Sequence, residues 1–275
     1  MSGTGARRGP AARQAALAGH VLAEGSASAA DLAERFGVSL MTIHRDLDEL
    51  ERQGIVRKFR GGVTAQPSGV FESNVQYRLK TMRAQKAALA RHALRHVEPG
   101  MAVLLDDSTT TLELARLLRS GEITPLTVVT NFLEAVNLLA GRRGIHLVAL
   151  GGDYDRLHAS FLGVSCVDAV RQLRVDVGFV STSGVHRGHA YHQEQHIVSV
   201  KRAMLDSAAR TLLLADHTKL GRVALHRVAP LSRFDLLLVD DGATPEALRD
   251  LAEHDVRYEV CPTGPREGDD RAGTA

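Results

Sequence analysis

The sequence predicts an α/β protein of two domains: a helix-turn-helix unit with a basic hairpin, then a doubly wound parallel sheet. Residues 28–64 read as a short helix, a glycine turn, a second helix and a hairpin rich in basic residues. After Pro99-Gly100, apolar runs of four to six residues alternate with helical patterns, which is typical of a parallel sheet covered on both faces. The 275 residues accommodate both domains, since one domain takes ~100–200 residues.

Breaks in composition mark the domain boundaries. Residues 1–11 are rich in Gly, Ala and Arg, and Pro67-Ser68-Gly69 interrupts the pattern after the hairpin. The charged, glycine-rich end of the chain predicts disorder. We therefore expect a helix-turn-helix unit at 12–66, a linker at 67–85, an α/β domain at 86–262 and a disordered tail at 263–275.

The helix-turn-helix unit carries signals for its helix ends. Ser28, three residues before Asp31, predicts an N-cap for the first helix, and Gly37 allows a turn conformation that other residues avoid. Ser39 is placed to cap the second helix and Gly54 to end it. A helix pair of this kind can place its second helix in a DNA groove.

Only the first turns of that second helix suit close contact with DNA. Ile43, Leu47 and Leu50 predict its buried face. Its carboxyl half would be repelled by phosphates, because it carries Asp46, Asp48, Glu49 and Glu51. In the first turns, Arg45 could read a guanine edge. The candidate DNA contacts are Ser39, Met41, Thr42, His44 and Arg45, with Arg57, Lys58, Arg60, Gly61 and Gly62 of the hairpin.

Alternatives stay open for this part of the chain. The unit could be a helical hairpin that contacts another protein, and Arg45 could pair with Asp48 or Glu49 on its own helix. Residues 78–95 contain six basic residues and no acidic one. They predict a basic helix whose charges are either solvated or in contact with DNA.

The elements of the second domain follow in order. Predicted strands cover Ala102–Leu105, Leu126–Val129, Ile145–Leu150, Val175–Val180, Thr211–Ala215 and Leu236–Val239. Predicted helices cover Thr111–Arg119, Phe132–Ala140, Val164–Leu173, Gln195–Ala209 and Pro245–His254. Ligands of doubly wound sheets bind beyond the carboxyl ends of the strands, so polar residues there are candidate ligand contacts.

A polar loop follows the first of these strands, and hydroxyls and amides at a helix start form a ready anion site. The carboxylates of Asp106 and Asp107 disfavour bare phosphate and suit sugar hydroxyls, which predicts a phosphorylated sugar. The alternative is that Ser108 or Thr109 only caps the helix. The candidate effector contacts are Asp106, Asp107, Ser108, Thr109, Thr110, Thr130, Asn131, Gly151, Gly152, Lys201, Asp216 and Lys219.

The role of the two lysines in this set is open. Lys201 and Lys219 could neutralise phosphate, pair with Asp216 or lie in solvent. Asp106, Asp107 and Lys201 could also supply acid–base groups to a sugar-phosphate isomerase-like enzyme with a DNA-binding head. No carboxylate–lysine motif of established spacing supports that alternative, so we expect no catalytic residue and no enzyme.

A histidine group consists of His186, His189, His192 and His196. His192 and His196 would share a helix face if their segment is helical, a geometry able to bind zinc. No cysteine and few carboxylates lie close by in the sequence. We therefore expect no metal and favour a polar loop at the rim of a ligand site.

Composition excludes several classes of protein. The formal net charge is only +2, so DNA binding must rest on local clusters of charge. Trp is absent, which argues against single-strand base stacking. Cys166 and Cys261 are too few for a disulfide framework and fit a reducing cytoplasm. We expect neither a targeting signal nor a membrane span, which needs ~18 apolar residues.

The residues of the first unit resemble a known family. Val38–Leu50, followed by Arg57–Gly62, is similar to the DeoR-type (deoxyribose-operon repressor) transcriptional regulators. Their signature has a Ser, a Thr, a basic pair and Asp-Leu at this spacing, with a Gly-Gly wing; His44 stands where an arginine is usual. Residues 78–260 resemble the same family in the Asp-rich loop, Val129–Asn131, Leu150–Gly152, Ser160 with Gly163, Val200–Arg202 and Asp216–Lys219.

The resemblance implies a winged helix-turn-helix head and a Rossmann-like sensor domain similar to ribose-5-phosphate isomerase. It implies a transcriptional regulator, expected to be a repressor of carbohydrate metabolism, that is controlled by a phosphorylated sugar and needs no cofactor. Its partners would be double-stranded operator DNA, the sugar phosphate and further copies of the chain. Paired half-sites multiply the modest affinity of a single head.

Overall fold

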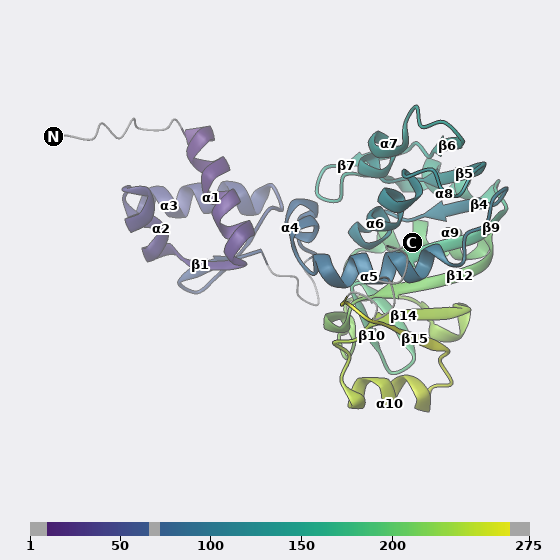
Figure 1. The fold of residues 1–275 in the computed structure, drawn as a ribbon. Coiled ribbons are helices and arrows are strands. Elements are labelled where there is room, and N and C mark those ends of the chain that lie inside the picture. The colour runs from purple at the N-terminus through teal and green to yellow at the C-terminus, as the bar shows by residue number, and fades with distance from the viewer. Residues whose placement is uncertain (1–9, 66–71, 265–275) are drawn as a thin grey trace, which may run out of the picture. The chain divides into compact units, whose positions relative to one another are not determined.

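The structure, a computed structural model, describes residues 10–65 and 72–264. The chain divides into two compact units, Met1–Thr81 and Met82–Ala275 (Figure 1). The boundary falls inside the segment predicted as a linker, but part of that segment is a helix, α4 (Val75–Lys80). Residues 1–9 of the expected arm, 66–71 of the expected linker region and 265–275 of the expected tail lie outside the described residues.

In the described residues, the first unit combines four helices with a small antiparallel sheet. Strand β3 lies between β1 and β2, so the basic hairpin forms a wing. The apolar faces of the first three helices meet in one core around Leu17, Leu32 and Leu47. This winged helix-turn-helix confirms the predicted fold. Its elements are α1 (Pro10–Glu24), β1 (Ser26–Ser28), α2 (Ala29–Phe36), α3 (Leu40–Arg52), β2 (Arg57–Phe59), β3 (Gly62–Thr64) and α4.

The predicted helix ends of this unit are confirmed. Ser28 Oγ accepts a hydrogen bond from the amide of Asp31 at 3.0 Å. Ser39 Oγ accepts one from the amide of Thr42 at 3.2 Å. Gly37 adopts the left-handed conformation with φ of 62°, so the chain can turn sharply between α2 and α3.

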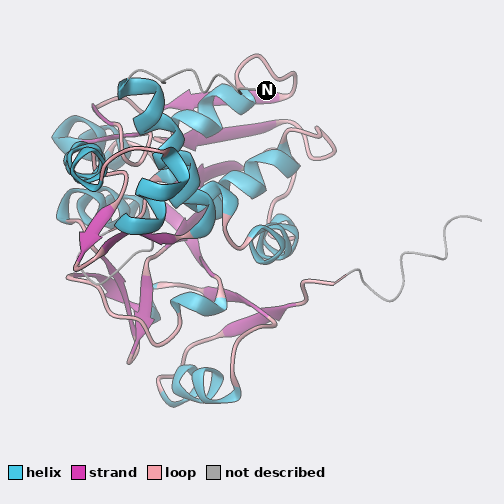
Figure 2. Ribbon diagram, turned by 90° about the vertical axis from the view of Figure 1, so that its left-hand side faces the viewer, coloured by secondary structure: helices cyan, strands magenta, loops and turns pink. Residues whose placement is uncertain are grey.

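The second unit is built on a seven-stranded sheet in the order β15-β14-β12-β9-β4-β5-β6. Every neighbouring pair in it is parallel (Figure 2). Its strands are β4 (Ala102–Leu105), β5 (Leu126–Thr130), β6 (Ile145–Ala149), β9 (Val175–Ser181), β12 (Ala208–Ala215), β14 (Leu236–Asp240) and β15 (Tyr258–Cys261). Its α-helices are α5 (Arg83–Leu94), α6 (Thr109–Leu118), α7 (Leu133–Leu139), α8 (Gly163–Arg171), α9 (Gln195–Ser207) and α10 (Pro245–Glu253).

Both faces of this sheet are buried, as its uninterrupted apolar strands predict. Leu104 packs in one core with residues of α8 and α9. Val103 and Leu105 are equally buried and point to the opposite face, because side chains alternate along a strand. The six predicted strands and five predicted helices are therefore confirmed, with ends that shift by a few residues.

Some elements differ from the sequence-based expectation. The basic segment 78–95 is not one helix, because Met82 takes a left-handed conformation with φ of 51° between α4 and α5. The unpredicted strands are β1, β7 (Asp153–Asp155), β8 (Ser160–Leu162), β10 (Gly184–His186), β11 (His189–His192), β13 (His226–Pro230) and β15. None of the helices within 10–65 and 72–264 combines the length and apolar character needed to cross a bilayer.

The strand order places a topological switch point in the middle of the sheet. From β4 the chain adds β5 and β6 on one side, and from β9 it adds β12, β14 and β15 on the other. The loops that follow β4 and β9 therefore run in opposite directions and leave a crevice between them. In open parallel sheets, ligands bind at such a point.

Candidate functional site

The first turns of α3 present an exposed, largely uncharged surface with one arginine. Met41 is 82% exposed, and His44 and Arg45 are also exposed. The hydroxyls of Ser39 and Thr42 lie 2.9 Å apart and hydrogen bond to each other. The structure thus groups all five candidate contacts of this helix at its amino-terminal end.

Arg45 does not pair with the acids of its own helix. Asp48 forms an ion pair with Lys58, and Glu49 Oε1 lies 2.5 Å from Arg52 Nη2. No hydrogen bond or ion pair joins the Arg45 side chain to another residue of the described chain. Its guanidinium is therefore available to an external acceptor.

Asp46 does not contribute to an acidic outer surface, which corrects the sequence-based expectation. Its side chain is 1% exposed and accepts hydrogen bonds from Arg13 Nε at 2.6 Å and Nη2 at 3.2 Å. Gln14 Nε2 donates a third bond, at 3.0 Å. The pKa of Arg13 is raised, chiefly by its hydrogen bond to Asp46. These hydrogen bonds hold α1 against α3, and the buried Asp46 carboxylate is not on the surface where it would repel phosphates.

The wing divides its basic residues between two tasks. Lys58 is held by Asp48, and its amide donates to Glu51 Oε1 at 2.7 Å. Arg57 and Arg60 are exposed, and their side chains have no recorded partner among the described residues. Of the ten candidate contacts, Lys58 is therefore the one whose charge is already engaged within the unit.

The two wing glycines are needed for different reasons. Gly61 has φ of 90° in the turn between β2 and β3, a conformation that glycine tolerates best. A Cβ on Gly62 would lie 2.6 Å from the carbonyl oxygen of Ala27 and 2.8 Å from the Phe59 ring. The close approach of β3 to β1 thus depends on the absence of a side chain there.

In the second unit, Asp106 is the centre of the switch point. It follows β4, and its Oδ2 accepts the amide of Ser181 at the end of β9, at 2.7 Å. Its Oδ1 accepts the amide of Ser108 at 3.1 Å and the hydroxyl of Thr111 at 3.0 Å. The carboxylate therefore ties β4, β9 and α6 together, a role that sequence reasoning did not assign to it.

Lys201 completes this network from α9. Its Nζ binds the Asp106 carboxylate and lies 3.4 Å from Asp107 Oδ1. Burial alone would lower the pKa of Lys201, but the charges of Asp106 and Asp107 outweigh it and raise the pKa. Ser160 Oγ donates to Asp107 Oδ2 at 3.0 Å. Among the described residues Lys201 thus pairs with Asp106 and Asp107, and not with Asp216, which was one of the alternatives left open.

The loop before α6 caps its helix and remains close to the network. Ser108 Oγ accepts the amide of Thr111 at 3.1 Å, so Ser108 is the N-cap of α6. Thr109 and Thr110 form the first turn of α6 and are buried. The backbone amides of a helix's first turn have no acceptor within the helix and attract anions.

Beside this loop, the end of β5 has an unsatisfied acceptor. Asn131 is fully buried, and its Nδ2 donates to the carbonyl of Phe161 at 2.9 Å. Asn131 Oδ1 has no hydrogen-bond partner among the described residues. Thr130 Oγ1 accepts the amide of Phe132 at 3.1 Å. Because buried acceptors are normally satisfied, Asn131 Oδ1 marks a place for an external donor.

The other candidate effector contacts lie along the same edge of the sheet. Gly151 and Gly152 follow β6 and are exposed. Asp216 follows β12 and caps a short 3-10 helix, accepting the amide of Thr218 at 3.1 Å, and Lys219 at the end of that helix is half-buried. The carboxyl ends of β12, β9, β4, β5 and β6 are consecutive in the sheet, so this rim spans all of them.

Sequence reasoning missed one further pair on the rim. Asp240 ends β14 and is fully buried; its Oδ1 accepts the amide of His217 at 2.6 Å, and its Oδ2 lies 2.7 Å from His217 Nδ1. The sequence feature that could have indicated it is Asp240, an acidic residue that directly follows the apolar residues Leu236–Val239. This pair holds the 3-10 helix against the neighbouring strand.

The histidine group is not arranged as the sequence suggested. His192 lies in β11 and His196 in α9, so the segment is not one helix and the two residues do not share a helix face. His186 and His189 are cross-strand partners in the β10–β11 hairpin. His196 instead lies near His158, with ring centroids 6.3 Å apart.

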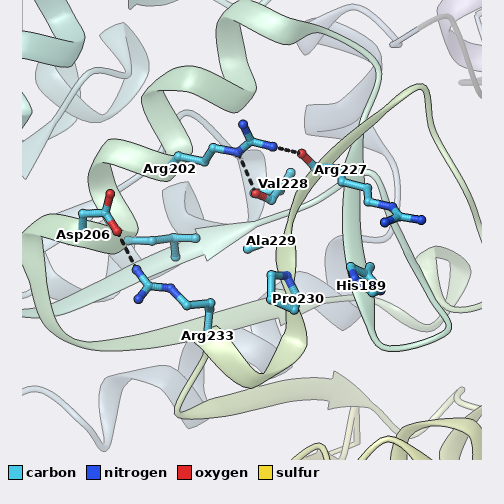
Figure 3. A pocket seen from close by; sticks show the side chains of 9 residues that line it. His189, Arg202, Asp206, Arg227, Val228, Ala229, Pro230 and Arg233 are labelled. Carbon is cyan, nitrogen blue, oxygen red and sulfur yellow. Dashed lines mark hydrogen bonds and ion pairs between the residues drawn. The ribbon is translucent and has the colours of Figure 1, made fainter.

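A separate pocket of about 480 Å³ lies between α9 and β13 (Figure 3). Arg202 donates to the carbonyls of Arg227 and Val228 at 2.7 and 2.9 Å, and Arg233 Nη2 lies 2.5 Å from Asp206 Oδ1. Two of its guanidiniums are therefore engaged within the protein. None of the candidate effector contacts lines this pocket.

Comparison with known proteins decides the family. A family model of the DeoR-like helix-turn-helix domain matches residues 13–68, and one of the DeoR C terminal sensor domain matches residues 81–241. The chain belongs to the DeoR family. Both halves of this DeoR-family transcriptional regulator thus carry the domain that their residues resemble, and the winged helix and the parallel sheet agree with that membership.

Individual relatives agree. The uncharacterized HTH-type transcriptional regulator YgbI of Escherichia coli K12 is 36% identical over 253 residues, 92% of this chain and 98% of that protein. The glycerol-3-phosphate regulon repressor of the same strain is 28% identical, over 86% of this chain and 94% of that protein. Among solved structures, ribose 5-phosphate isomerase A of Methanocaldococcus jannaschii is 21% identical with a TM-score of 0.35, covering 49% and 52% of the chains. A TM-score this low indicates only a slight structural similarity between the two chains.

Proposed function

We propose that this DeoR-family regulator is a repressor of a carbohydrate-metabolism operon. It binds double-stranded operator DNA through the first turns of α3 and through the wing, and it releases the DNA when a phosphorylated sugar binds the sensor. Such a protein acts in the compartment that holds the DNA, the cytoplasm of a bacterium. Two heads in a homo-oligomer would engage paired half-sites.

The observation that carries the DNA-binding part is the exposed, unpaired Arg45 at the groove-facing end of α3. The nearest acids are occupied, Asp48 by Lys58 and Glu49 by Arg52. Arginine reads guanine bidentately in the major groove and is the commonest specific contact. Arg57 and Arg60 are suited to phosphate contacts, which position a protein without reading sequence.

The polar rim of the sheet supports a sugar phosphate as the effector. Asn131 Oδ1 is a buried acceptor without a partner, which suits a sugar hydroxyl. The amides at the start of α6 and the half-buried Lys219 suit the phosphate. Lys201 is less suited, since its charge already balances Asp106 and Asp107. The repressor relative named for the glycerol-3-phosphate regulon favours the same class of ligand.

We also propose that the chain is not an enzyme. An isomerase would need a general base that is free to take a proton from its substrate. Asp106 accepts hydrogen bonds from Ser181, Ser108 and Thr111 in addition to the ion pair with Lys201. A structural hub of this kind is poorly suited to acid–base chemistry. Isomerisation of pentose or hexose phosphates by the purified chain would overturn this part.

The DNA-binding proposal is tested by gel shift on DNA upstream of the operon beside the protein's own gene. Arg45→Ala should abolish the specific shift. Arg249→Ala is the matched control, because it removes the charge of an exposed arginine on α10 of the second unit. Its shift should equal that of the parent. Equal binding by Arg45→Ala would show that α3 faces DNA differently or not at all.

The effector proposal is tested separately by thermal shift against a panel of sugar phosphates and the matching free sugars. A ligand at 100 times its dissociation constant stabilises the native state by ~2.7 kcal/mol. Thr109→Glu should remove the shift, because it adds a negative charge at the expected phosphate position. A panel in which free sugars stabilise as well as their phosphates would contradict the predicted ligand class.

A further inference from the structure

Four potential metal ligands converge at one place in the second unit. Asp155 ends β7, and His158 lies in the turn that leads to β8. Glu194 directly precedes α9, and His196 lies in its first turn. One ligand atom from each of these four residues lies within 4.8 Å of the other three. Segments some forty positions apart in the sequence thus present two imidazoles and two carboxylates to one point.

The spacing of these atoms fits a tetrahedral ion. His158 Nε2 lies 3.5 Å from Glu194 Oε1, and His196 Nε2 lies 3.1 Å from Glu194 Oε2 and 3.7 Å from Asp155 Oδ2. Ligands bound at ~2.0–2.1 Å to tetrahedral zinc are separated from one another by ~3.3–3.4 Å. These distances end on both oxygens of Glu194, and one ligand atom from each of the four residues lies within 4.8 Å of the others. The side chains must therefore move closer together to enclose the ion.

An orphaned nitrogen points independently to a ligand. The His158 side chain is 1% exposed, and its Nε2 has no hydrogen-bond partner among the described residues. Its Nδ1 lies 3.0 Å from Asp155 Oδ1 and donates to that carboxylate. In the neutral imidazole this leaves the Nε2 lone pair facing Oε1 of Glu194, a repulsion that a metal ion between the two atoms relieves, as does a second proton on the ring.

Charge and access agree with this arrangement. Two carboxylates and two neutral imidazoles carry a charge of −2, which a divalent cation cancels. His158 closes the inner side, whereas the His196 side chain is 46% exposed and leaves a path for an ion. The sequence predicted no metal here, because no cysteine and few carboxylates lie close to His192 and His196 in the chain. The fold replaces His192 with His158 and adds Asp155.

We propose that Asp155, His158, Glu194 and His196 bind one divalent cation with the ligand preferences of zinc. Nitrogen and oxygen donors in this number and geometry favour zinc over calcium or magnesium, which take oxygen ligands. The ion would clamp the β7–β8 hairpin to the start of α9, the helix that carries Lys201. The site needs neither DNA nor a sugar phosphate, so its test is independent of the proposed function.

The test is calorimetric titration of the chelator-stripped full chain with zinc chloride. We expect one zinc ion per chain for the parent. His196→Ala and Glu194→Gln should each weaken binding by ~10–100-fold, the range found for residues that support a metal site. Two histidine controls should bind as the parent does: His146→Ala, exposed on the edge strand β6, and His189→Ala, on the β10–β11 hairpin.

Melting temperatures provide the second measurement. Zinc should raise the melting temperature of the parent and leave that of His196→Ala unmoved, while the two proteins melt alike in chelator. No binding by the parent would overturn the proposal. So would undiminished binding by His196→Ala and Glu194→Gln. Loss of binding in His189→Ala would place the zinc on the β10–β11 hairpin and would also overturn it.

Discussion

Lys201 and Asp106 form a buried ion pair across the switch point of the sheet, although they lie 95 positions apart in the sequence. Their side chains are 4% and 0% exposed. Asp107 shares the ammonium group at 3.4 Å. The pair joins α9 to the loop between β4 and α6, so any ligand at this rim must bind next to a fixed pattern of charge.

Removing the lysine should destabilise the second unit strongly. Lys201→Met leaves two buried carboxylates without their cation, which should cost about 3–5 kcal/mol of unfolding free energy. Urea denaturation of the full chain measures it. Lys219→Met is the control, because the Lys219 side chain is half-buried at the same rim and has no ion-pair partner among the described residues; it should change stability by less than about 0.5 kcal/mol. A loss below about 1 kcal/mol for Lys201→Met would show that the pair contributes little.

The wing should fail when Gly62 gains a side chain. A Cβ there would lie 2.6 Å from the carbonyl of Ala27, so Gly62→Ala should destabilise the first unit by about 1–3 kcal/mol and weaken DNA binding. Gly19→Ala is the matched control, since nothing lies within 4 Å of its Cβ in α1. It should stabilise the helix by up to about 1 kcal/mol. Equal melting of the two variants would contradict the close approach of β1 and β3.

His44 should control the number of phosphate contacts. It is exposed beside Arg45. His44→Arg adds a cation at the groove-facing end of α3, so DNA affinity at low salt should rise. The slope of log K against log salt should steepen by ~0.9, the value for one more phosphate contact. Fluorescence anisotropy over a salt series measures it, and an unchanged slope would place position 44 away from the backbone.

Lowering the pH should remove the stability that the Asp155–His158 contact contributes. The pKa of Asp155 is lowered from 3.8 to about 2, chiefly by the hydrogen bond from His158. The unfolded chain therefore takes up this proton at a higher pH than the native chain. The stability from this contact is present above the unfolded pKa and is lost as pH falls toward the folded one.

Asp155→Asn removes that contribution at every pH. In chelator, the difference in unfolding free energy between the parent and Asp155→Asn should therefore be largest near about pH 6 and should narrow by about pH 3. Urea denaturation at several pH values measures it. A difference that stays constant, or that widens on acidification, would contradict the lowered pKa.

Much of the fold follows from local pattern. The strands of the large sheet are apolar on both faces, so each can be recognised from its own residues without knowing which strands lie beside it. The hairpins β7–β8 and β10–β11 consist of short segments with several polar residues, so their pairing depends on contacts made elsewhere. Helix caps at Ser28 and Ser39 were predictable because their partners lie three residues away.

The positions of the candidate site residues could be predicted from the sequence, but the contacts between their side chains could not. Strand ends locate Asp106 and Asn131, since topology alone brings such ends together. Sequence cannot show that Lys201 neutralises Asp106 rather than Asp216, or that Asp46 turns inward to Arg13. Those contacts depend on side-chain placement across elements. The cluster around His158 could not be predicted for the same reason, because its members lie on different elements and have no regular spacing in the sequence.

The central claim is that sugar-phosphate binding in the sensor and DNA binding by the head are coupled. Coupling requires that the effector bind the DNA-competent and DNA-free states unequally. The direct measurement is the dissociation constant for operator DNA, by fluorescence anisotropy, with and without the sugar phosphate that raises the melting temperature. We predict that the effector raises this constant by about tenfold or more, within the usual range of allosteric coupling. A constant that is the same in both conditions, with the effector bound, would contradict the account.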